Sequence, residues 1–126
     1  MRPAAKRGTS LVLMHLLVNI AHGTAHLKLH IELGSVALLF VIVVIIVCPL
    51  LAALLLWTSQ QRFGLILLAL SMAASLIFGM YNHFVAIGPD RVGQQASSPW
   101  AIAFVITAYL LFLAEAAGTY IGVHFL

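Results

Sequence analysis

Nine charged residues divide this chain of 126 into long uncharged runs, and their spacing constrains the fold more than any other feature. In chain order the runs are 20, 29, 27, 23 and 11 residues long, and they cover residues 8–27, 33–61, 63–89, 92–114 and 116–126. An α-helix needs about 20 apolar residues to cross a membrane core about 30 Å thick. Four runs reach this length, and a single residue, Glu115, separates the fourth run from the fifth. The spacing therefore predicts four membrane-spanning helices.

The composition excludes most other classes of protein. Hydrophobic residues make up 63% of the chain and charged residues 7%, against about 25% charged residues in an ordinary soluble domain. A soluble globular domain, a disordered chain, an outer-membrane β-barrel and a nucleic-acid-binding protein are all inconsistent with runs of this kind. We predict an all-α integral membrane protein whose partner is the lipid bilayer and not nucleic acid. Short connections favour a single domain, residues 1–126, folded as an up-down-up-down four-helix bundle.

Capping and helix-breaking residues set the expected bounds of the spans. We place the four spans at about residues 10–29, 35–57, 63–87 and 99–125. Thr9 or Ser10 is a good N-cap for the first span, and Gly34 is the expected break after it. Pro49 lies inside the second span and should kink it, because proline lacks the backbone N–H that an α-helix uses.

Basic residues mark the expected orientation of the chain. Arg2, Lys6 and Arg7 lie before the first span, and Arg62 lies in the second connection. Lys28 and Arg91 lie in the other two connections. The positive-inside rule therefore puts both termini in the cytoplasm and makes the protein multi-pass. The start of the chain, basic and then apolar, resembles a signal peptide. His15 and Asn19 interrupt its apolar part, so we expect it to remain as the first span.

A stripe of polar residues follows one face of the first span. At 100° per residue, the side chains of His15, Asn19, His22 and His26 fall within about 60° of one another. His30 continues the stripe at its edge. Polar groups in a membrane helix are costly in lipid and normally face the interior of a bundle. The stripe therefore identifies the inward face of this helix.

The spacing His22-x3-His26-x3-His30 suits metal binding, since residues four apart lie one turn above each other. His83, near the end of the third span, reaches a similar depth in the predicted bundle. His22, His26 and His83 would then form a nitrogen-rich site for Zn²⁺, Cu or Fe, with His30 and Glu32 as further candidate ligands. Two of these imidazoles from different helices would alternatively ligate the iron of haem b. A purely structural interpretation also stands, in which each histidine only hydrogen-bonds a neighbouring helix.

Glu115 is the one acidic residue in the middle of a span. Helical rise puts it at the depth of His15, on helices that are neighbours in an up-down bundle. We therefore predict a charge or proton pair of His15 and Glu115, with Asn19 as a second partner, because each group is costly to leave alone in lipid. Gly118 and Gly122 share the Glu115 face, and a Gly-x3-Gly motif favours close helix contact.

These residues leave three kinds of function open. The first is binding of a transition metal or haem for redox chemistry or for metal or proton transfer. The second is a non-catalytic accessory or assembly subunit of a larger membrane complex, and the third is a membrane enzyme that acts on lipid or quinone with His and Glu as acid and base. Whether the chain is an enzyme stays open, because it has no Ser-His-Asp arrangement, no CxxC motif and one cysteine, Cys48. Transport would favour a homo-oligomer, since four helices leave little room for a transport cavity.

Overall fold

The computed structural model describes residues 3–126, which form helices joined by loops, with no β-strand among them. The first long helix is α1 (Pro3–Lys28), and the last is α5 (Pro99–His124). The second consists of α2 (Ser35–Phe40), the π-helical segment η1 (Val41–Val47) and α3 (Cys48–Leu55). The third consists of α4 (Gln61–Met80) and the π-helical segment η2 (Tyr81–Val85). All four are long and apolar enough to cross a membrane, as the charge spacing predicts.

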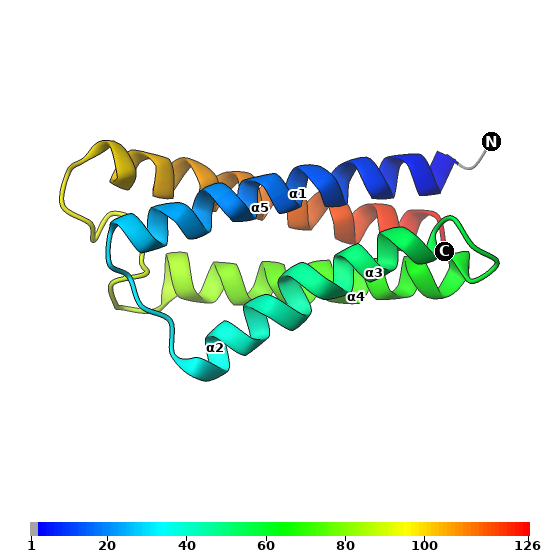
Figure 1. Cartoon of the computed structure of the whole chain (residues 1–126), viewed down its shortest axis with the longest axis horizontal. Coiled ribbons are helices and arrows are strands. Elements are labelled where there is room, and N and C mark those ends of the chain that lie inside the picture. The colour runs from blue at the N-terminus through cyan, green and yellow to red at the C-terminus, as the bar shows by residue number, and fades with distance from the viewer. Residues whose placement is uncertain (1–2) are drawn as a thin grey trace.

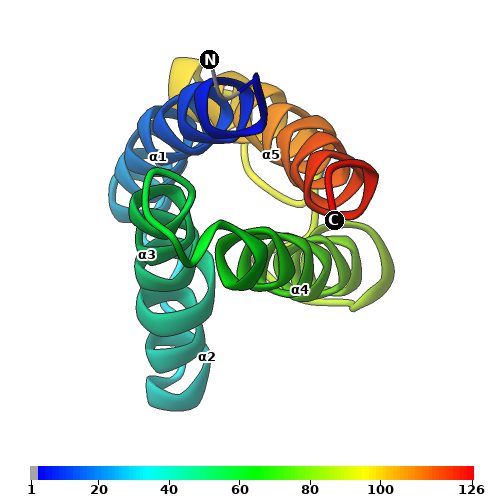
Figure 2. The same ribbon diagram turned by 90° about the vertical axis from the view of Figure 1, so that its right-hand side faces the viewer.

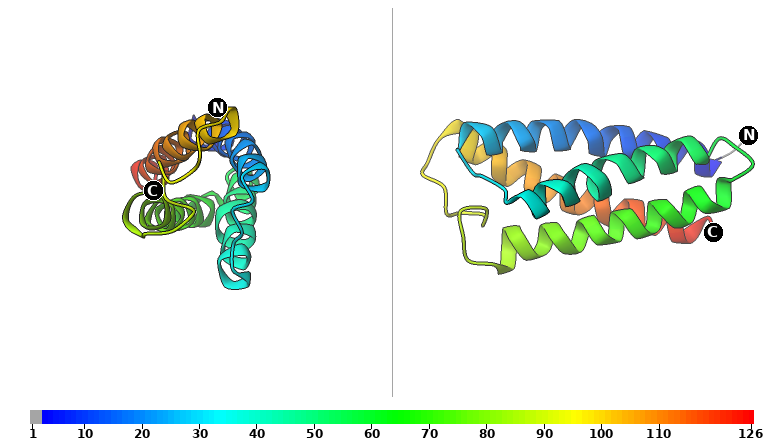
Figure 3. Two further views of the ribbon diagram at one scale, coloured as in Figure 1. Left: turned by 90° about the vertical axis from the view of Figure 1, so that its left-hand side faces the viewer. Right: turned by 60° about the horizontal axis from the view of Figure 1, so that its bottom comes forward.

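The four long helices surround a common axis (Figure 2). Side-by-side contacts join α1 to α5, α5 to α4, α4 to α3 and α3 to α1, so α1 and α4 lie diagonally opposite. Both termini and the short turn between α3 and α4 lie at one end of the molecule, which we call the terminal end (Figure 1). The connections 29–34 and 86–98 lie at the opposite end, which we call the loop end (Figures 1 and 3).

The first helix begins earlier than the sequence predicts. α1 runs from Pro3 and not from about residue 10, so Thr9 and Ser10 lie inside the helix and do not cap it. The added turns contain Ala4 and Ala5, which are buried in the core shared with α3 and α4, where small side chains let helices approach closely. The Thr9 hydroxyl instead accepts a hydrogen bond of 2.8 Å from the Trp57 indole, which ties α1 to the end of α3.

His30, rather than Gly34, ends the first helix. His30 adopts a left-handed backbone conformation with φ of 54°. Its N–H donates to the Leu27 carbonyl oxygen at 3.3 Å, and the Ile31 N–H donates to the His26 carbonyl oxygen at 3.0 Å. This is the Schellman pattern that commonly ends helices, here with histidine at the position usually taken by glycine. The predicted end of the first span at about residue 29 is therefore close to the observed one, and Gly34 lies in the break as the N-cap of α2. The residue that ends α1 is His30, because histidine tolerates the left-handed conformation.

A π-helical segment precedes Pro49, where the second span is expected to kink. Pro49 has no N–H to donate to the Ile45 carbonyl oxygen, so wider hydrogen bonding in η1 accommodates it. α2, which precedes η1 in the chain, diverges from the other helices near the loop end (Figure 2). It stays attached to α4 through Phe40, whose ring stacks on Phe78 at a centroid distance of 4.7 Å. The bundle is therefore tighter at the terminal end than at the loop end.

The core differs between the two ends of the bundle. An apolar cluster from α1, α3 and α4 fills the terminal end and includes Val12, Leu56 and Met72. α5 packs closely on α4 through Gly122, where an added Cβ would lie 2.7 Å from the Ala69 backbone nitrogen. Towards the loop end many of the buried side chains are polar, and these polar side chains form the candidate site.

Candidate metal centre

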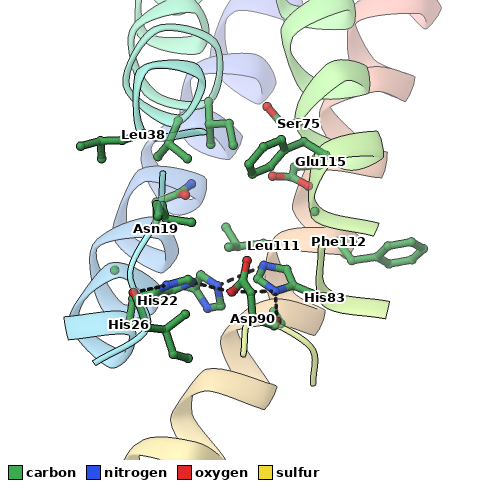
Figure 4. A pocket seen from close by; sticks show the side chains of 18 of the residues that line it. Asn19, His22, His26, Leu38, Ser75, His83, Asp90, Leu111, Phe112 and Glu115 are labelled. Atoms are coloured by element: carbon green, nitrogen blue, oxygen red, sulfur yellow. Dashed lines mark hydrogen bonds and ion pairs between the residues drawn. The ribbon is translucent and has the colours of Figure 1, made fainter. Parts of the chain in front are cut away.

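Three histidines from two helices meet at the loop end of the bundle (Figure 4). His22 and His26 lie one turn apart on α1, and His83 lies in η2, across the bundle. One nitrogen of each ring lies within 4.8 Å of the others, close enough to hold a metal ion. His22 Nε2 and His83 Nε2 are 3.3 Å apart. We call these three residues the histidine trio; His22 and His83 are buried, and His26 is half-buried.

One aromatic ring supports all three histidines. Phe104 on α5 is fully buried, and its ring centroid lies 4.8 Å from that of His22, 5.2 Å from that of His26 and 5.4 Å from that of His83. The His22 ring stacks on the phenyl ring, and the other two meet it at steeper angles. Because protein interiors are densely packed, these contacts restrict rotation of the imidazoles and keep them together.

Hydrogen-bond partners assign the tautomer of His83 and allow two tautomers for His22. The His83 Nδ1–H donates to the backbone oxygen of Asp90 at 2.9 Å, which leaves a lone pair on His83 Nε2. The Thr107 hydroxyl lies 2.7 Å from His22 Nδ1 and 2.7 Å from the Ala103 carbonyl oxygen. When the hydroxyl donates to Ala103, the His22 Nδ1–H donates to Thr107 and His22 Nε2 has a lone pair. When the hydroxyl donates to His22 Nδ1, the His22 proton is on Nε2.

The two Nε2 atoms face each other across 3.3 Å, and both belong to buried side chains. With the His22 proton on Nε2, the two neutral rings share a hydrogen bond. With the His22 proton on Nδ1, both Nε2 atoms offer a lone pair to the same point, where a bare metal ion would accept both. The geometry therefore suits either an imidazole hydrogen bond or a bound cation.

His26 contacts an acceptor with each ring nitrogen. Its Nε2 lies 3.0 Å from Asp90 Oδ1, and its Nδ1 lies 3.4 Å from the backbone oxygen of Ile31. Carboxylate and carbonyl oxygens only accept, so whichever of the two nitrogens carries the ring proton faces an acceptor. Asp90 Oδ1 also lies 3.4 Å from His83 Nδ1. One carboxylate therefore bridges two members of the histidine trio.

Asp90 is a site residue that the sequence does not reveal. It belongs to the connection 86–98, whose polar composition suits an exposed loop. One feature of the sequence could have pointed to this residue: Asp90 is the only acidic residue between the third and fourth spans. Burial by itself raises the pKa of the Asp90 carboxyl, but the hydrogen bond from His26 and the nearby charges of the histidine trio outweigh burial. The pKa therefore lies below its ordinary value, and Asp90 is a carboxylate beside the histidines.

The chain after α4 folds back so that its loop covers the histidine trio. The π-helical segment η2 carries His83, and such segments are frequent at functional sites. The His83 carbonyl oxygen accepts a hydrogen bond of 2.8 Å from the Val92 N–H, which brings Asp90 over the His83 ring. Gln95 Nε2 donates at 2.7 and 2.8 Å to the two backbone oxygens that flank Asp90. The loop is thereby fixed in place around Asp90.

The further candidate ligands, His30 and Glu32, lie outside the group of nitrogens that approach one another. Both side chains are exposed, and His30 supplies the left-handed residue that ends α1. Both residues line a cavity that adjoins the histidine trio. They contribute to its rim rather than to the cluster of buried nitrogens.

A second polar group lies deeper in the bundle. His15 Nε2 on α1 lies 3.3 Å from Glu115 Oε1 on α5, and both side chains are buried. Asn19, one turn along α1, donates from Nδ2 to the His15 backbone oxygen at 3.0 Å, and the same Nδ2 lies 3.1 Å from His15 Nε2. The structure thus brings together the three residues for which the sequence predicts a charge or proton pair.

A cavity of about 520 Å³ adjoins both polar groups (Figure 4). Its polar lining includes the histidine trio, Asp90 and Glu115, and much of the remainder consists of apolar side chains of α2, η1 and α4. Gly79 lies beside both groups, since an added Cβ would be 3.7 Å from Glu115 Oε2 and 3.9 Å from His83 Cδ2. The lack of a side chain at Gly79 keeps this part of the cavity open.

No protein-family model, no curated protein and no solved structure matches the chain. The described residues nevertheless define a specific chemical arrangement. Three imidazoles and a carboxylate converge at one end of a cavity, and a buried acid faces the same cavity from deeper in the bundle.

Proposed function

We propose that this chain is a multi-pass membrane protein that binds a transition-metal ion at His22, His26 and His83, at the loop end of an up-down-up-down bundle. The observation that carries the proposal is the pair of facing Nε2 atoms of His22 and His83, 3.3 Å apart. The His83 Nδ1–H donates to Asp90, so His83 Nε2 offers a lone pair, and His22 Nε2 offers one to the same point when Thr107 accepts the proton of His22 Nδ1. Metal-bound histidines typically donate from one nitrogen and ligate with the other.

The spacing of these two nitrogens suits a tetrahedral ion. Zinc–nitrogen bonds of about 2.0–2.1 Å at tetrahedral angles put neighbouring ligand nitrogens roughly 3.3–3.4 Å apart. His22 and His83 meet this spacing without rearrangement. The ligand atom of His26, within 4.8 Å of the others, has to move closer to complete a three-nitrogen site. Zn²⁺, Cu and Fe all accept imidazole ligands, and tetrahedral Zn²⁺ fits this spacing.

Asp90 supports such a site by orienting its ligands. Its carboxylate oxygen lies 3.4 Å from His83 Nδ1, the nitrogen of that ring that would not ligate the ion. Histidine ligates metals in its neutral form, so metal affinity should fall as the pH is lowered. A carboxylate that orients metal-bound histidines typically contributes about 10–100-fold to metal affinity.

The same geometry favours a bare ion over haem b. Two axial histidines bind haem iron from opposite faces of a flat macrocycle. With iron–nitrogen bonds of about 2 Å, similar to those of zinc, their nitrogens stand about 4 Å apart with the macrocycle between them. His22 Nε2 and His83 Nε2 are closer, at 3.3 Å, and Phe104 packs against the His22 ring. This arrangement leaves no room for a macrocycle.

The surface of the bundle supports membrane insertion. Each long helix leaves large hydrophobic side chains exposed; they include Leu17 of α1, Leu54 of α3, Ile77 of α4 and Leu113 of α5. Hydrophobic surface of this extent is unusual on soluble monomers, and lipid would cover it. Lys6, Arg7 and Arg62 belong to the terminal end, so the positive-inside rule favours that end in the cytoplasm. The metal site would then lie near the non-cytoplasmic surface.

Direct measurement of bound metal tests the proposal. The protein, purified in detergent without a histidine tag, is stripped with a chelator and titrated with Zn²⁺, and its metal content is determined by elemental mass spectrometry. We expect about one ion per chain. Asp90→Asn should weaken binding by about 10–100-fold. His22→Ala and His83→Ala should weaken it further, because each removes a ligand.

His124→Ala is the matched control, because His124 stacks on Tyr120 near the end of α5, outside the histidine trio. This variant should bind zinc as the wild type does. Equal metal content in the wild type and in the double variant His22→Ala/His83→Ala, with equal helical circular-dichroism spectra, would overturn the proposal. The histidine trio would then be a hydrogen-bonded network that shares a proton.

A further inference from the structure

We propose, building on the metal site, that the cavity of about 520 Å³ binds a lipid-soluble quinone, whose ring lies between Glu115 and the histidine trio. Ligand pockets in proteins commonly measure roughly 300–1,000 Å³. A metal ion and its ligands need far less space, so metal binding alone leaves this volume unexplained. The remaining features of the cavity are its two polar positions, its charge and its apolar walls.

Two polar positions face the cavity (Figure 4). The histidine trio with Asp90 forms the first, and Glu115 forms the second. Glu115 Oε1 contacts His15, whereas no hydrogen bond from any of residues 3–126 reaches Oε2. Both Oε2 and the edge of the His83 ring lie within 4 Å of the place where a Gly79 Cβ would be. A flat ring lying over Gly79 would therefore contact the edge of the His83 ring and bring one oxygen to Glu115 Oε2.

The charges at the cavity favour an uncharged head group. Three acidic residues line it, Glu32, Asp90 and Glu115, and no lysine or arginine is among its lining residues. His26 already pairs with Asp90, and His15 already pairs with Glu115. A carboxylate or phosphate head group lying over Gly79 would therefore meet the Glu115 carboxyl with no lysine or arginine to pair with. A quinol hydroxyl would instead donate to Glu115 Oε2, and the ring carries no charge.

The apolar walls of the cavity suit a hydrocarbon tail. The cavity reaches the space between α1 and the divergent α2, where its lining includes Leu27 and Leu38, both exposed. Gly23 lines the same space, and nothing lies within 4 Å of where its Cβ would be. In a bilayer this side of the bundle would face lipid. The ligand would therefore enter sideways and leave its tail among the acyl chains.

Photolabelling in a bilayer tests the quinone site. The untagged protein, either loaded with zinc or stripped of metal, is reconstituted in lipid nanodiscs and irradiated with an azidobenzoquinone that carries a decyl tail. We expect mass spectrometry to find the label on peptides from η1, α4 or η2, which line the cavity. Excess decyl-benzoquinone should suppress this labelling. The same excess of 1-decanol, which has the tail without the ring, should not.

Two neighbouring positions on α2 provide a matched pair of variants. Leu38 lines the cavity and Leu39 does not, and both side chains are exposed, so tryptophan at either position should leave the core intact. We expect Leu38→Trp to reduce the quinone-suppressible labelling about tenfold, which corresponds to about 1.4 kcal/mol. Leu39→Trp should label as the wild type does, and both variants should keep their zinc.

Three outcomes would overturn the quinone site: label spread over the lipid-facing helices, equal suppression by 1-decanol, or equal labelling of Leu38→Trp and Leu39→Trp. Zinc measured on the same samples separates this inference from the proposed function. Bound zinc without quinone-suppressible labelling keeps the metal site and rejects the quinone site. Quinone-suppressible labelling in a protein that binds no zinc rejects the metal site and keeps the cavity as a ligand site.

Discussion

The buried imidazoles of this bundle are oriented by the nitrogen that does not face the site. His22 Nδ1 hydrogen-bonds the Thr107 hydroxyl, and His83 donates from Nδ1 to the backbone of Asp90. The second contact puts a lone pair on His83 Nε2, and the first does the same for His22 Nε2 when the hydroxyl accepts the proton. Thr107 therefore has a direct influence on the chemistry of the site, although it cannot itself be one of the nitrogen ligands.

Replacement of Glu115 tests the deeper polar pair. We expect Glu115→Ala to lower the free energy of unfolding by about 1–3 kcal/mol more than Glu115→Gln does. Alanine leaves the buried His15 N–H without its acceptor, whereas glutamine keeps a carbonyl oxygen there. Reversible unfolding in mixed detergent, followed by circular dichroism, measures the difference. The exposed acid Glu32 provides the control, since Glu32→Ala should change stability by less than about 0.5 kcal/mol. Equal losses in the two Glu115 variants would contradict the pair.

Among the helices, irregular segments determine where the histidines lie. The Schellman end of α1 brings the Ile31 carbonyl oxygen to 3.4 Å from His26 Nδ1. The π-helical segment η2 carries His83 at the end of α4. Both segments depart from the regular period of 3.6 residues, so periodicity identifies the helix faces without giving the final direction of each ring.

α4 and α5 pack closely at two glycines. An added Cβ at Gly122 would lie 2.7 Å from the Ala69 nitrogen and 2.9 Å from its Cα, whereas at Gly118 it would meet the Met72 side chain at 2.6 Å. A side chain can rotate away, but backbone atoms can move only with their helix. We therefore expect Gly122→Ala to destabilise the protein by about 1–3 kcal/mol and Gly118→Ala by less.

Gly23 provides the control for this pair of substitutions. Nothing lies within 4 Å of its Cβ position, and alanine in a helix is favoured over glycine by about 0.5–1 kcal/mol. Gly23→Ala should therefore raise stability. Unfolding of the wild type and the three variants in the same detergent measures the order. A Gly122→Ala variant as stable as the wild type would exclude the close contact between α4 and α5.

At the scale of the whole molecule, the two ends of the bundle differ in packing. Apolar and small side chains fill the terminal end, whereas the loop end holds the polar groups and the cavity. The connection 86–98 closes the loop end by placing Asp90 on the histidine trio. The tightly packed end supports the polar end, because costly buried polar groups persist only where surrounding contacts stabilise them.

Two introduced cysteines test the orientation of the whole bundle. In a Cys48→Ala background, Ser59→Cys lies in the turn between α3 and α4, and Ser97→Cys lies in the connection 86–98; both positions are exposed. We expect a membrane-impermeant maleimide to label Ser97→Cys in intact spheroplasts of a bacterial expression host, and Ser59→Cys only after lysis. The opposite pattern would invert the orientation. Labelling of both positions in intact spheroplasts would exclude a bundle that spans the membrane.

The sequence by itself determined the lengths of the apolar helices and the faces that they turn inward. Nine charges in 126 residues leave runs that predict four helices long and apolar enough to cross a membrane, and the described residues contain four such helices. The period of the polar stripe then predicts that His15 and His22 face inward, and both are buried. The depth of Glu115 predicts its contact with His15, because helical rise converts sequence distance into depth.

Only the tertiary structure decided the chemistry of the site. Asp90 reaches His26 because the loop folds back on a hydrogen bond between Val92 and His83, a contact that no local pattern encodes. The 3.3 Å between His22 Nε2 and His83 Nε2 likewise depends on the path of two diagonal helices and on the partners of their Nδ1 atoms. The helical period of the polar residues identifies which side chains face the interior of the bundle. Which of them meet, and with which atoms, depends on backbone geometry that forms only when the whole chain packs.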